Sequence, residues 1–307
     1  MFKLICKRIL ALIPVALGVI TVVCLLIHAV PGDPLDTLLG DYAGAEEKDA
    51  LRKQLGLDQP ALFQLYHYIA RLLHGDLGRS LIYNRPVAEL ILERMPATLE
   101  LAVCSLIIAI LISLPLGILS ALNKNKPLDY VAMGFALSGV AIPHFWLGPM
   151  LILLFSIYLG WLPVSERTDL SSYILPSITL GTALAAILSR MTRNSVLDTM
   201  KEDYVRTARA KGARESSVLL KHVLRNAALP LVTIVGLQFG VLLTGAVVTE
   251  KIFDWPGLGT LILDGLGNRD YPLVQGCVLV FSMSYLIVNL LTDLAYRAFD
   301  PRISWDE

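Results

Sequence analysis

The sequence predicts an all-α membrane protein with about six transmembrane helices, and both its composition and its apolar runs support this fold class. Of the 307 residues, 55% are hydrophobic and 17% are charged, and the mean hydropathy is +0.63. Soluble domains carry about 25% charged residues, so a soluble chain of this composition would expose large apolar surfaces. Six runs free of acidic and basic side chains could each hold a spanning helix of about 20 residues: Ile9–Gly32, Leu101–Asn123, Tyr130–Ser165, Leu170–Ser189, Asn226–Thr249 and Tyr271–Thr292.

The first run predicts a retained helix at about residues 9–31, with a cleaved signal peptide as the alternative. Basic residues precede the run, as they do in a signal peptide: Lys3, Lys7 and Arg8. However, the run exceeds the about 7–15 apolar residues typical of signal peptides. It also ends at Pro31-Gly32-Asp33-Pro34, which is a turn sequence and not a small-residue cleavage site. We therefore expect the helix to remain in the mature chain.

A long polar segment, residues 32–97, follows the first run and is expected outside the membrane. Three of its stretches have helical character: Ala45–Leu55, Leu62–Leu73 and Pro86–Met95. The sequence Gly56-Leu57-Asp58-Gln59-Pro60 is expected to end the first of them, because Gly and Pro interrupt helices.

The third run is too long for one straight crossing, since a helix rises about 1.5 Å per residue and the hydrocarbon core is about 30 Å thick. Pro143 lies inside the run and removes a helix hydrogen bond. We predict one kinked span at about residues 130–159, with Gly160–Pro163 outside the membrane. With the other spans at about residues 9–31, 99–122, 171–190, 227–249 and 272–293, residues 1–307 form a single transmembrane domain.

The distribution of basic residues predicts that both termini face the cytoplasm. Six spans place the termini on the same side, and most Lys and Arg residues of the short loops lie there, as the positive-inside rule requires. The basic residues on the other side lie mainly in the long segment 32–97, and long loops carry little weight in this rule. The short-loop and terminal residues are Lys3, Lys7, Arg8, Lys124, Lys126, Arg190, Arg193, Lys201, Arg206, Arg209, Lys211, Arg214, Lys221, Arg225, Arg297 and Arg302.

The inner loop, residues 191–226, is strongly basic and helical in pattern. Residues 202–211 predict a short helix with small side chains at Ala208 and Ala210. Gly212 is expected to end it, because glycine adopts the left-handed conformation of helix C-termini. Residues 216–225 predict a second helix that leads into the fifth span. Spacing alone leaves two readings open: a loop that only contacts phospholipid, or a surface that docks into an acidic groove of a partner.

The loop resembles the EAA coupling loop of permeases of ATP-binding-cassette (ABC) importers, and the whole chain resembles the B-type permeases of the dipeptide, oligopeptide, glutathione and nickel group. The matching motifs together cover essentially the full length. Arg206 stands where the wider superfamily often has Glu, and the distance from Gly212 to Leu229-Pro230 is longer than in sugar importers; both features fit the peptide branch. The motifs are Pro31–Pro34, Leu55–Pro60, Gly75–Gly78, Pro96–Leu101, Asp203–Gly212, Leu224–Ala227, Leu229-Pro230, Trp255–Gly259, Arg269–Pro272 and Asp300–Arg302.

The resemblance implies a permease subunit that forms half of the translocation pathway of an ATP-driven, binding-protein-dependent importer in the bacterial inner (cytoplasmic) membrane. Its implied partners are a homologous second permease, two ATPase subunits and a periplasmic or lipid-anchored substrate-binding protein. The resemblance assigns ATPase coupling to Tyr204, Arg206, Ala208, Arg209, Lys211 and Gly212, and it suggests an outer gate at Trp255, Pro256 and Gly257. The implied substrate is a short peptide or glutathione, with nickel or a metal–metallophore complex as the alternative.

Other functions are disfavoured by the motifs and charges of the chain. It has no G-x-x-x-x-G-K-[ST] phosphate loop, so ATP and Mg²⁺ are expected on partner subunits and no cofactor on this chain. Acidic and basic residues balance at 26 each, which argues against a nucleic-acid partner. An intramembrane hydrolase is the runner-up from a different class, but the sequence lacks H-E-x-x-H and G-x-S-x-G, so no enzyme activity is expected. A stand-alone carrier is the other alternative.

The four cysteines form no C-x-x-C pair and are expected to be small buried residues rather than metal ligands.

Ionisable residues at membrane depth are candidates for the substrate path, because burying them in lipid is costly. Glu100 lies at the outer start of the second span, and His28 and His144 lie within spans. We single out His144 and Glu100 as candidates for substrate contact, with a purely structural role as the alternative for each. Asp293, near the inner end of the last span, is expected at the interface.

Overall fold

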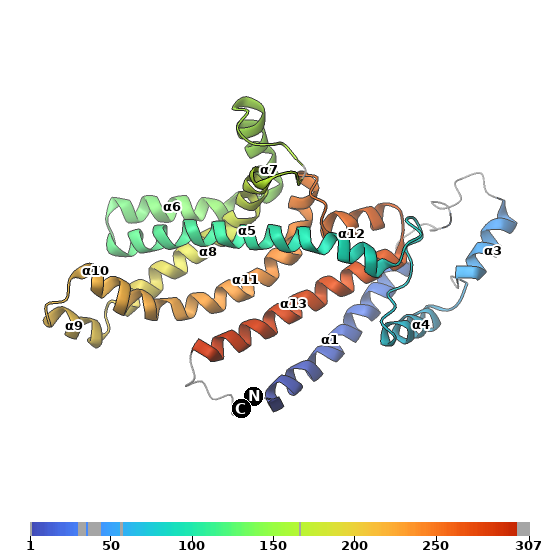
Figure 1. Cartoon of the computed structure of the whole chain (residues 1–307), viewed down its shortest axis with the longest axis horizontal. Helices are drawn as coiled ribbons and strands as arrows, with labels where there is room; N and C mark the ends of the chain where they lie inside the picture. The colour runs from blue at the N-terminus through green and yellow to red at the C-terminus, as the bar shows by residue number, and fades with distance from the viewer. Residues whose placement is uncertain (1, 30–34, 36–43, 56–57, 166, 300–307) are drawn as a thin grey trace. The chain divides into compact units, whose positions relative to one another are not determined.

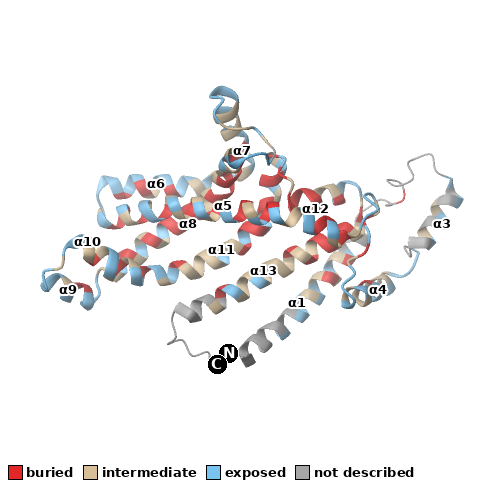
Figure 2. Ribbon diagram, viewed as in Figure 1, coloured by how far each residue is buried: buried red, intermediate tan, exposed pale blue. Residues whose placement is uncertain are grey.

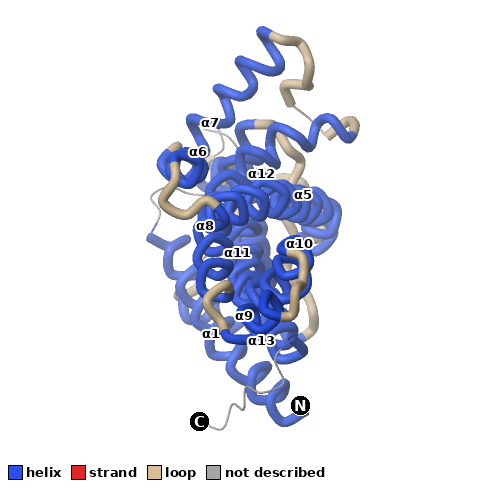
Figure 3. The backbone as a smooth tube through the Cα atoms, turned by 90° about the vertical axis from the view of Figure 1, so that its left-hand side faces the viewer, coloured by secondary structure: helices blue, strands red, loops and turns tan. Residues whose placement is uncertain are grey.

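The computed structural model describes residues 2–29, 35, 44–55, 58–165 and 167–299. Helices dominate these residues, and the only β interaction among them is an isolated bridge between Arg79 and Pro86 (Figures 1 and 3). The predicted all-α class is thereby confirmed. The motifs at residues 31–34 and 300–302, the end of the first predicted span and Gly56-Leu57 lie outside the described residues, as do the side chains of His28 and Asp293.

The chain divides into two compact units, which we describe separately. Unit 1 comprises Met1–Thr98 and Pro256–Leu286, and unit 2 comprises Leu99–Trp255 and Ile287–Glu307. Two helices continue from one unit into the other: α5 (Val87–Leu122) and α13 (Tyr271–Phe299).

Unit 1 contains α1 (Phe2–Ala29), α3 (Ala45–Leu55), α4 (Ala61–Leu73), the start of α5, α12 (Leu258–Gly267) and the start of α13. Helices α1 and α4 are in contact, and Ile20, Tyr68 and Leu279 form a small apolar cluster. Burial raises the pKa of the Tyr68 phenol to about 12. The predicted helices at Ala45–Leu55 and Leu62–Leu73 are confirmed as α3 and α4.

The helix predicted at Pro86–Met95 is present, but its predicted end at Met95 is wrong, because α5 starts at Val87 and continues without interruption past Pro96 to Leu122. A proline removes one backbone hydrogen bond, but it does not end a helix that is held by packing on both sides. Ile91 and Leu101, which flank Pro96, are both buried.

The described part of unit 2 contains the rest of α5 and α13 together with nine further helical segments. Helix α8 carries the most extensive buried surface among them and contacts α6, α7 and α11 (Figure 2). The segments are α6 (Pro127–Ala141), α7 (His144–Leu151), η1 (Ile152–Tyr158), η2 (Leu170–Tyr173), α8 (Ile174–Thr199), α9 (Asp203–Ala210), α10 (Glu215–Ser217), η3 (Val218–Val223) and α11 (Leu224–Ile252).

Helices α5 and α8 approach each other so closely that two positions require glycine. A Cβ atom added to Gly117 would lie 2.5 Å from Thr192 Cβ and 2.7 Å from the Ser189 carbonyl oxygen. A Cβ atom on Gly181 would lie 2.7 Å from the Ser105 carbonyl oxygen. Small residues at such crossings bring helix backbones into direct contact, as in many membrane proteins.

Four helical segments of the described residues are long and apolar enough to cross a membrane: Val87–Leu122, Leu170–Thr199, Glu215–Thr244 and Tyr271–Thr292. A fifth crossing would combine Pro127–Ala141 with His144–Tyr158, which are bent by 105°. The break falls at Ile142 and Pro143, where the sequence predicts it, but it is sharper than a kink. Ile142 is extended (φ −87°, ψ 118°), as residues before proline prefer. Helix α1, the first predicted span, has 28 residues.

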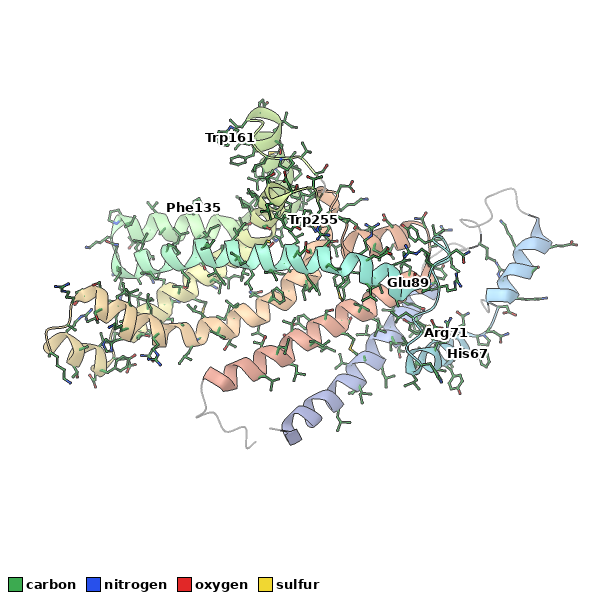
Figure 4. The ribbon with its side chains drawn as sticks, viewed as in Figure 1. His67, Arg71, Glu89, Phe135, Trp161 and Trp255 are labelled. Carbon is green, nitrogen blue, oxygen red and sulfur yellow. The ribbon has the colours of Figure 1, made fainter. Side chains whose placement is uncertain are left out.

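The arm formed by α7 and η1 projects from α6 and carries exposed aromatic side chains, among them Phe145 and Tyr158, and Trp161, which follows the arm, is 68% exposed (Figure 4). Helix η1 is a π-helix, a form that is uncommon beyond a single turn. Of the cysteines whose side chains are described, Cys24 and Cys277 are buried and Cys104 is half-buried, in agreement with their predicted role as small core residues.

Candidate functional site

The basic loop at residues 191–226 folds as a short helix, a glycine turn and a second helix, as the sequence predicts. Helix α9 ends one residue before Lys211, and α10 and η3 follow and lead into α11 (Figure 1). We call the end of unit 2 that carries α9 and the α5–α6 turn the coupling end.

A few inward-facing side chains attach α9 to the rest of unit 2. Val205 is fully buried, in a cluster with Ala121 of α5 and Val196 of α8. Ala208, one turn further along α9, is partly buried against the same cluster. Residues three apart share a helix face, so the apolar face of α9 is narrow and the remainder is available to a partner. The buried cluster also includes Val218, Val223 and Ala227.

The outward face of α9 is polar and exposed. Tyr204 is 42% exposed, and Arg206, Lys211 and Gly212 are also exposed. Arg206 makes a long contact with Asp203, 3.5 Å between Nη1 and Oδ1, with both side chains largely in solvent. Such exposed pairs contribute little to stability, so Arg206 can exchange this contact for one with a partner at small cost.

Gly212 ends α9 in the left-handed conformation, with φ +80°. The backbone N–H of Ala213 donates to the Ala208 carbonyl at 3.2 Å, and the N–H of Gly212 donates to the Arg209 carbonyl at 2.9 Å. This is the hydrogen-bond pattern of a Schellman motif, which strongly favours glycine at the position of Gly212. The predicted role of Gly212 as the helix stop is confirmed.

Arg209 closes the turn with a salt bridge. Its Nε and Nη2 atoms donate to Glu215 Oε1 at 2.8 Å and Oε2 at 3.2 Å. A two-bond contact of this kind fixes the orientation of the guanidinium as well as its distance. Arg209 therefore joins α9 to α10.

A hollow of about 400 Å³ opens beside the start of α9. Its lining is mixed polar and apolar, with two acidic residues, Asp198 and Glu202, and the aromatic ring of Tyr204. The lining is completed by Met191, Asn194, Ser195, Thr199, Asn226 and Pro230. A hollow next to an exposed helix can receive a protruding side chain from a docked protein.

Glu100, a candidate for the substrate path, belongs to a hydrogen-bonded network that sequence reasoning missed. Arg167 Nη2 donates to Glu100 Oε1 at 2.7 Å, and the Tyr173 hydroxyl donates to Glu100 Oε2 at 2.6 Å. Arg167 Nε donates to the Tyr173 oxygen at 3.0 Å. This hydrogen bond and the negative charge of Glu100 both raise the pKa of the Arg167 guanidinium. The two charged side chains remain 40% and 35% exposed. Residues 67 positions apart form this contact, so no local spacing could reveal it.

The residues of the predicted outer gate fall in two units. Trp255, in unit 2, is fully buried and its ring meets Tyr173 edge to face, with centroids 4.7 Å apart. Trp255 therefore packs against a member of the Glu100 network. Pro256 and Gly257 belong to unit 1, where Gly257 precedes α12 and its carbonyl accepts the Thr260 hydroxyl at 2.9 Å.

His144, the other substrate-path candidate, lies at the first position of α7 and contacts α8. Its Nδ1 atom is 2.8 Å from the Thr179 carbonyl oxygen. The ring is half-buried, and this bond holds α7 against α8 directly after the break at Pro143. The contact is within unit 2 and does not include Glu100.

Apolar helices of spanning length, a sharply bent pair of apolar helices and a basic helix–glycine–helix segment define a multi-pass membrane protein. Comparison with known families makes the class specific: the family described as binding-protein-dependent transport system inner membrane component matches residues 113–305, and the N-terminal family of the same components matches residues 1–102. The chain belongs to this family, the permease subunits of ABC importers.

Individual relatives agree with this assignment over the full length. The chain is 47% identical to the glutathione transport system permease protein GsiC of Salmonella choleraesuis (strain SC-B67), over 305 residues that cover 99% of this chain and 100% of that protein. It is 46% identical to the protein of the same name from Escherichia coli (strain K12), with the same coverage. Such relatives are non-catalytic transport subunits that work with other ABC components.

Solved structures share the fold at low sequence identity. The MetNI methionine ABC transporter in inward-facing conformations matches with a TM-score of 0.58 and 18% identity, over 69% of this chain and 97% of that chain. An amino acid ABC transporter crystallised with histidines matches with a TM-score of 0.51 and 14% identity, over 70% of this chain and 95% of that chain.

Proposed function

We propose that this chain is one of two permease subunits of an importer for short peptides, with glutathione as the foremost candidate substrate. The observation that carries this proposal is the 46–47% identity, over the whole chain, to glutathione transport permeases. A substrate class can differ between relatives at this identity, so dipeptides and nickel chelates belong in the same experiment.

The proposed complex pairs this chain with a homologous second permease, two ATPase subunits and a periplasmic or lipid-anchored binding protein. ATP and Mg²⁺ bind the ATPase subunits, and this chain holds no cofactor of its own. We place the ATPase contact on Tyr204, Arg206, Ala208, Arg209, Lys211 and Gly212. The exposed outer face of α9, its narrow apolar attachment and the adjacent hollow support this placement.

The proposed topology has six spans in the bacterial inner membrane, with both termini in the cytoplasm and residues 32–97 in the periplasm. Helix α1 supplies the first span, and the bent pair α6 and α7 occupies the third. The basic residues around α9 support a cytoplasmic position for the coupling end. Glu100 and His144 then lie along the substrate path, and Trp255, Pro256 and Gly257 lie at the outer gate.

The test is reconstitution of the chain with its second permease and ATPase subunits in proteoliposomes. ATP hydrolysis is measured with binding protein that is empty, or loaded with glutathione, a dipeptide or a nickel chelate. Stimulation by loaded binding protein, together with accumulation of the ligand inside the vesicles, is the expected result. The ligand that stimulates identifies the cargo.

A matched pair of variants tests the ATPase contact in the same preparation. Arg206→Glu reverses a charge on the exposed face of α9, and Arg79→Glu reverses an exposed charge in unit 1, where no ATPase contact is proposed. We expect Arg206→Glu alone to reduce co-purification of the ATPase. Equal co-purification of the ATPase with both variants would remove Arg206 from the proposed contact. A wild-type chain that binds no ATPase and still transports would move the assignment to a stand-alone carrier.

A further inference from the structure

A buried carboxylate at the coupling end joins three helices of unit 2, α5, α6 and α8. Asp129 lies in the first turn of α6, and its side chain is 4% exposed. Four donors meet its two oxygens: the Ser120 hydroxyl, the Asn125 backbone N–H at 2.9 Å, and Arg193 Nε and Nη2 at 2.8 and 2.7 Å. We call Ser120, Asn125, Asp129 and Arg193 the Asp129 cluster.

Each member of the Asp129 cluster comes from a different part of the fold. Ser120 belongs to the end of α5, Asn125 to the α5–α6 turn, and Arg193 to α8. The turn itself is tight, with Asn125 at φ +62°, a conformation that asparagine tolerates better than most residues. Because Arg193 binds both carboxylate oxygens, the contact fixes the rotation of α6 against α8 as well as their separation.

The Asp129 cluster adjoins the apolar cluster that anchors α9. Ser120 precedes Ala121 on α5, and Arg193 lies three residues before Val196 on α8. Ala121 and Val196 are the residues against which Val205 is buried. The anchor of α9 and the Asp129 cluster are therefore consecutive layers on the same two helices.

The helices that share these layers have little freedom to slide. The Gly117 position, one turn before Ser120, brings the α5 backbone against Thr192 and Ser189, and Gly181 repeats such a contact further along α8. Closely packed interiors transmit displacement because they cannot deform continuously.

We propose that Asp129 and Arg193 are positioning residues of the coupling step, which make α5, α6 and α8 move as one body with α9. The inference rests on the proposed contact between α9 and an ATPase. A displacement of α9 passes to the rest of unit 2 through Val205, and the Asp129 cluster extends it from α8 to the α5–α6 turn. Without the cluster, α9 still docks and ATP is still hydrolysed, but α6 no longer follows.

The test uses the full transporter in proteoliposomes and compares the number of substrate molecules transported per ATP hydrolysed. Arg193→Lys keeps the charge but loses the two-bond contact. Arg85→Lys is the matched control, since Arg85 makes a comparable two-bond contact with Glu93 on the surface of unit 1, with side chains 44% and 54% exposed. We expect Arg193→Lys to retain ATP hydrolysis stimulated by loaded binding protein. The number of substrate molecules transported per ATP is expected to fall at least about fivefold, which is the lower end of the range for typical coupling energies. Arg85→Lys is expected to match wild type.

A second variant covers a failure of Arg193→Lys to assemble. Asp129→Asn combined with Arg193→Gln leaves no unpaired charge at the site and retains hydrogen-bonding groups. If this double variant assembles, the same drop in transport per ATP is expected. A wild-type ratio in either assembled variant overturns the inference, and so does failure of both to assemble, because the residues would then serve assembly alone.

The outcome for wild type separates this inference from the proposed function. A wild-type complex that ignores loaded binding protein overturns the importer assignment and the inference with it. A responsive wild-type complex whose Arg193 variants keep the normal ratio overturns the inference alone.

Discussion

Two of the arginine–carboxylate contacts in unit 2, Arg193–Asp129 and Arg167–Glu100, have similar chemistry and very different burial. Both include a residue of α5: Ser120 of the Asp129 cluster and Glu100 of the Glu100 network are separated by 20 residues, about 30 Å of helix. In each, an arginine and a hydroxyl donate to the same carboxylate. Asp129 and Arg193 are 4% and 20% exposed, whereas Glu100 and Arg167 are 40% and 35% exposed.

The difference in burial determines what each contact can do. A buried carboxylate that loses its partner cannot recruit water, so the surrounding fold depends on the pair. An exposed pair exchanges its partner for water or for another charged group at small cost. The Asp129 cluster is therefore suited to hold helices together permanently, and the Glu100 network to open and close or to meet a charged substrate.

The largest expected effect is on stability and comes from Arg193→Met, which leaves Asp129 buried without its main partner. We expect a loss of about 2–3 kcal/mol, below the about 3–5 kcal/mol of fully buried pairs, because Arg193 retains some contact with water. Thermal unfolding of the purified chain in detergent measures it. The double variant Asp129→Leu with Arg193→Met removes both charges and is expected to recover much of the loss; equal destabilisation of the single and double variants would contradict this.

The next largest effect is expected from Gly117→Ala, at the contact between α5 and α8. The new methyl group would meet Thr192 and the Ser189 carbonyl well inside contact distance, so the helices must separate, at about 1–3 kcal/mol. Gly134→Ala on α6 is the matched control, because nothing lies within 4 Å of its added Cβ. The control is expected to be neutral or to gain stability from helix propensity. Similar melting temperatures for the two variants would show that α5 and α8 are less tightly packed.

A smaller and local effect is expected from Gly212→Ala at the end of α9. Alanine in the left-handed conformation costs about 1 kcal/mol, which shifts the α9–α10 turn without unfolding the bundle. ATP hydrolysis stimulated by the loaded binding protein is expected to fall, with little change in thermal stability. Gly212→Asn, which tolerates this conformation better, should retain more of the stimulation. Equal activity of both variants would mean that the turn geometry does not matter for coupling.

The features that sequence reasoning found are local, and those it missed are tertiary. The α9 helix and its stop at Gly212 depend on neighbouring residues, as does the break at Pro143, so all three were predictable. The Asp129–Arg193 contact joins residues 64 apart, and no periodicity relates them. Asp129 was excluded from the predicted third span because charged residues served to delimit the spans. The helix end predicted at Met95 is wrong for a different reason. Pro96 locally favours the end of a helix, but the burial of α5 residues on both sides of Pro96 keeps the helix continuous.

The smallest expected effect is that of Glu100→Gln, which tests the exposed half of the comparison. Glutamine keeps the shape and can still accept the Tyr173 hydroxyl, so the loss is limited to the attraction between Glu100 and Arg167, at most about 1 kcal/mol. Salt screens exposed charges, so the difference in melting temperature between wild type and Glu100→Gln should shrink when ionic strength rises from 0.01 M to about 1 M. The matched difference for Arg193→Met should persist at high salt, because buried charges are screened far less. A decrease in melting temperature for Glu100→Gln that does not depend on salt would show that the Glu100 carboxylate is shielded from solvent. The Glu100–Arg167 and Asp129–Arg193 contacts would then differ less in their shielding than their exposed fractions indicate.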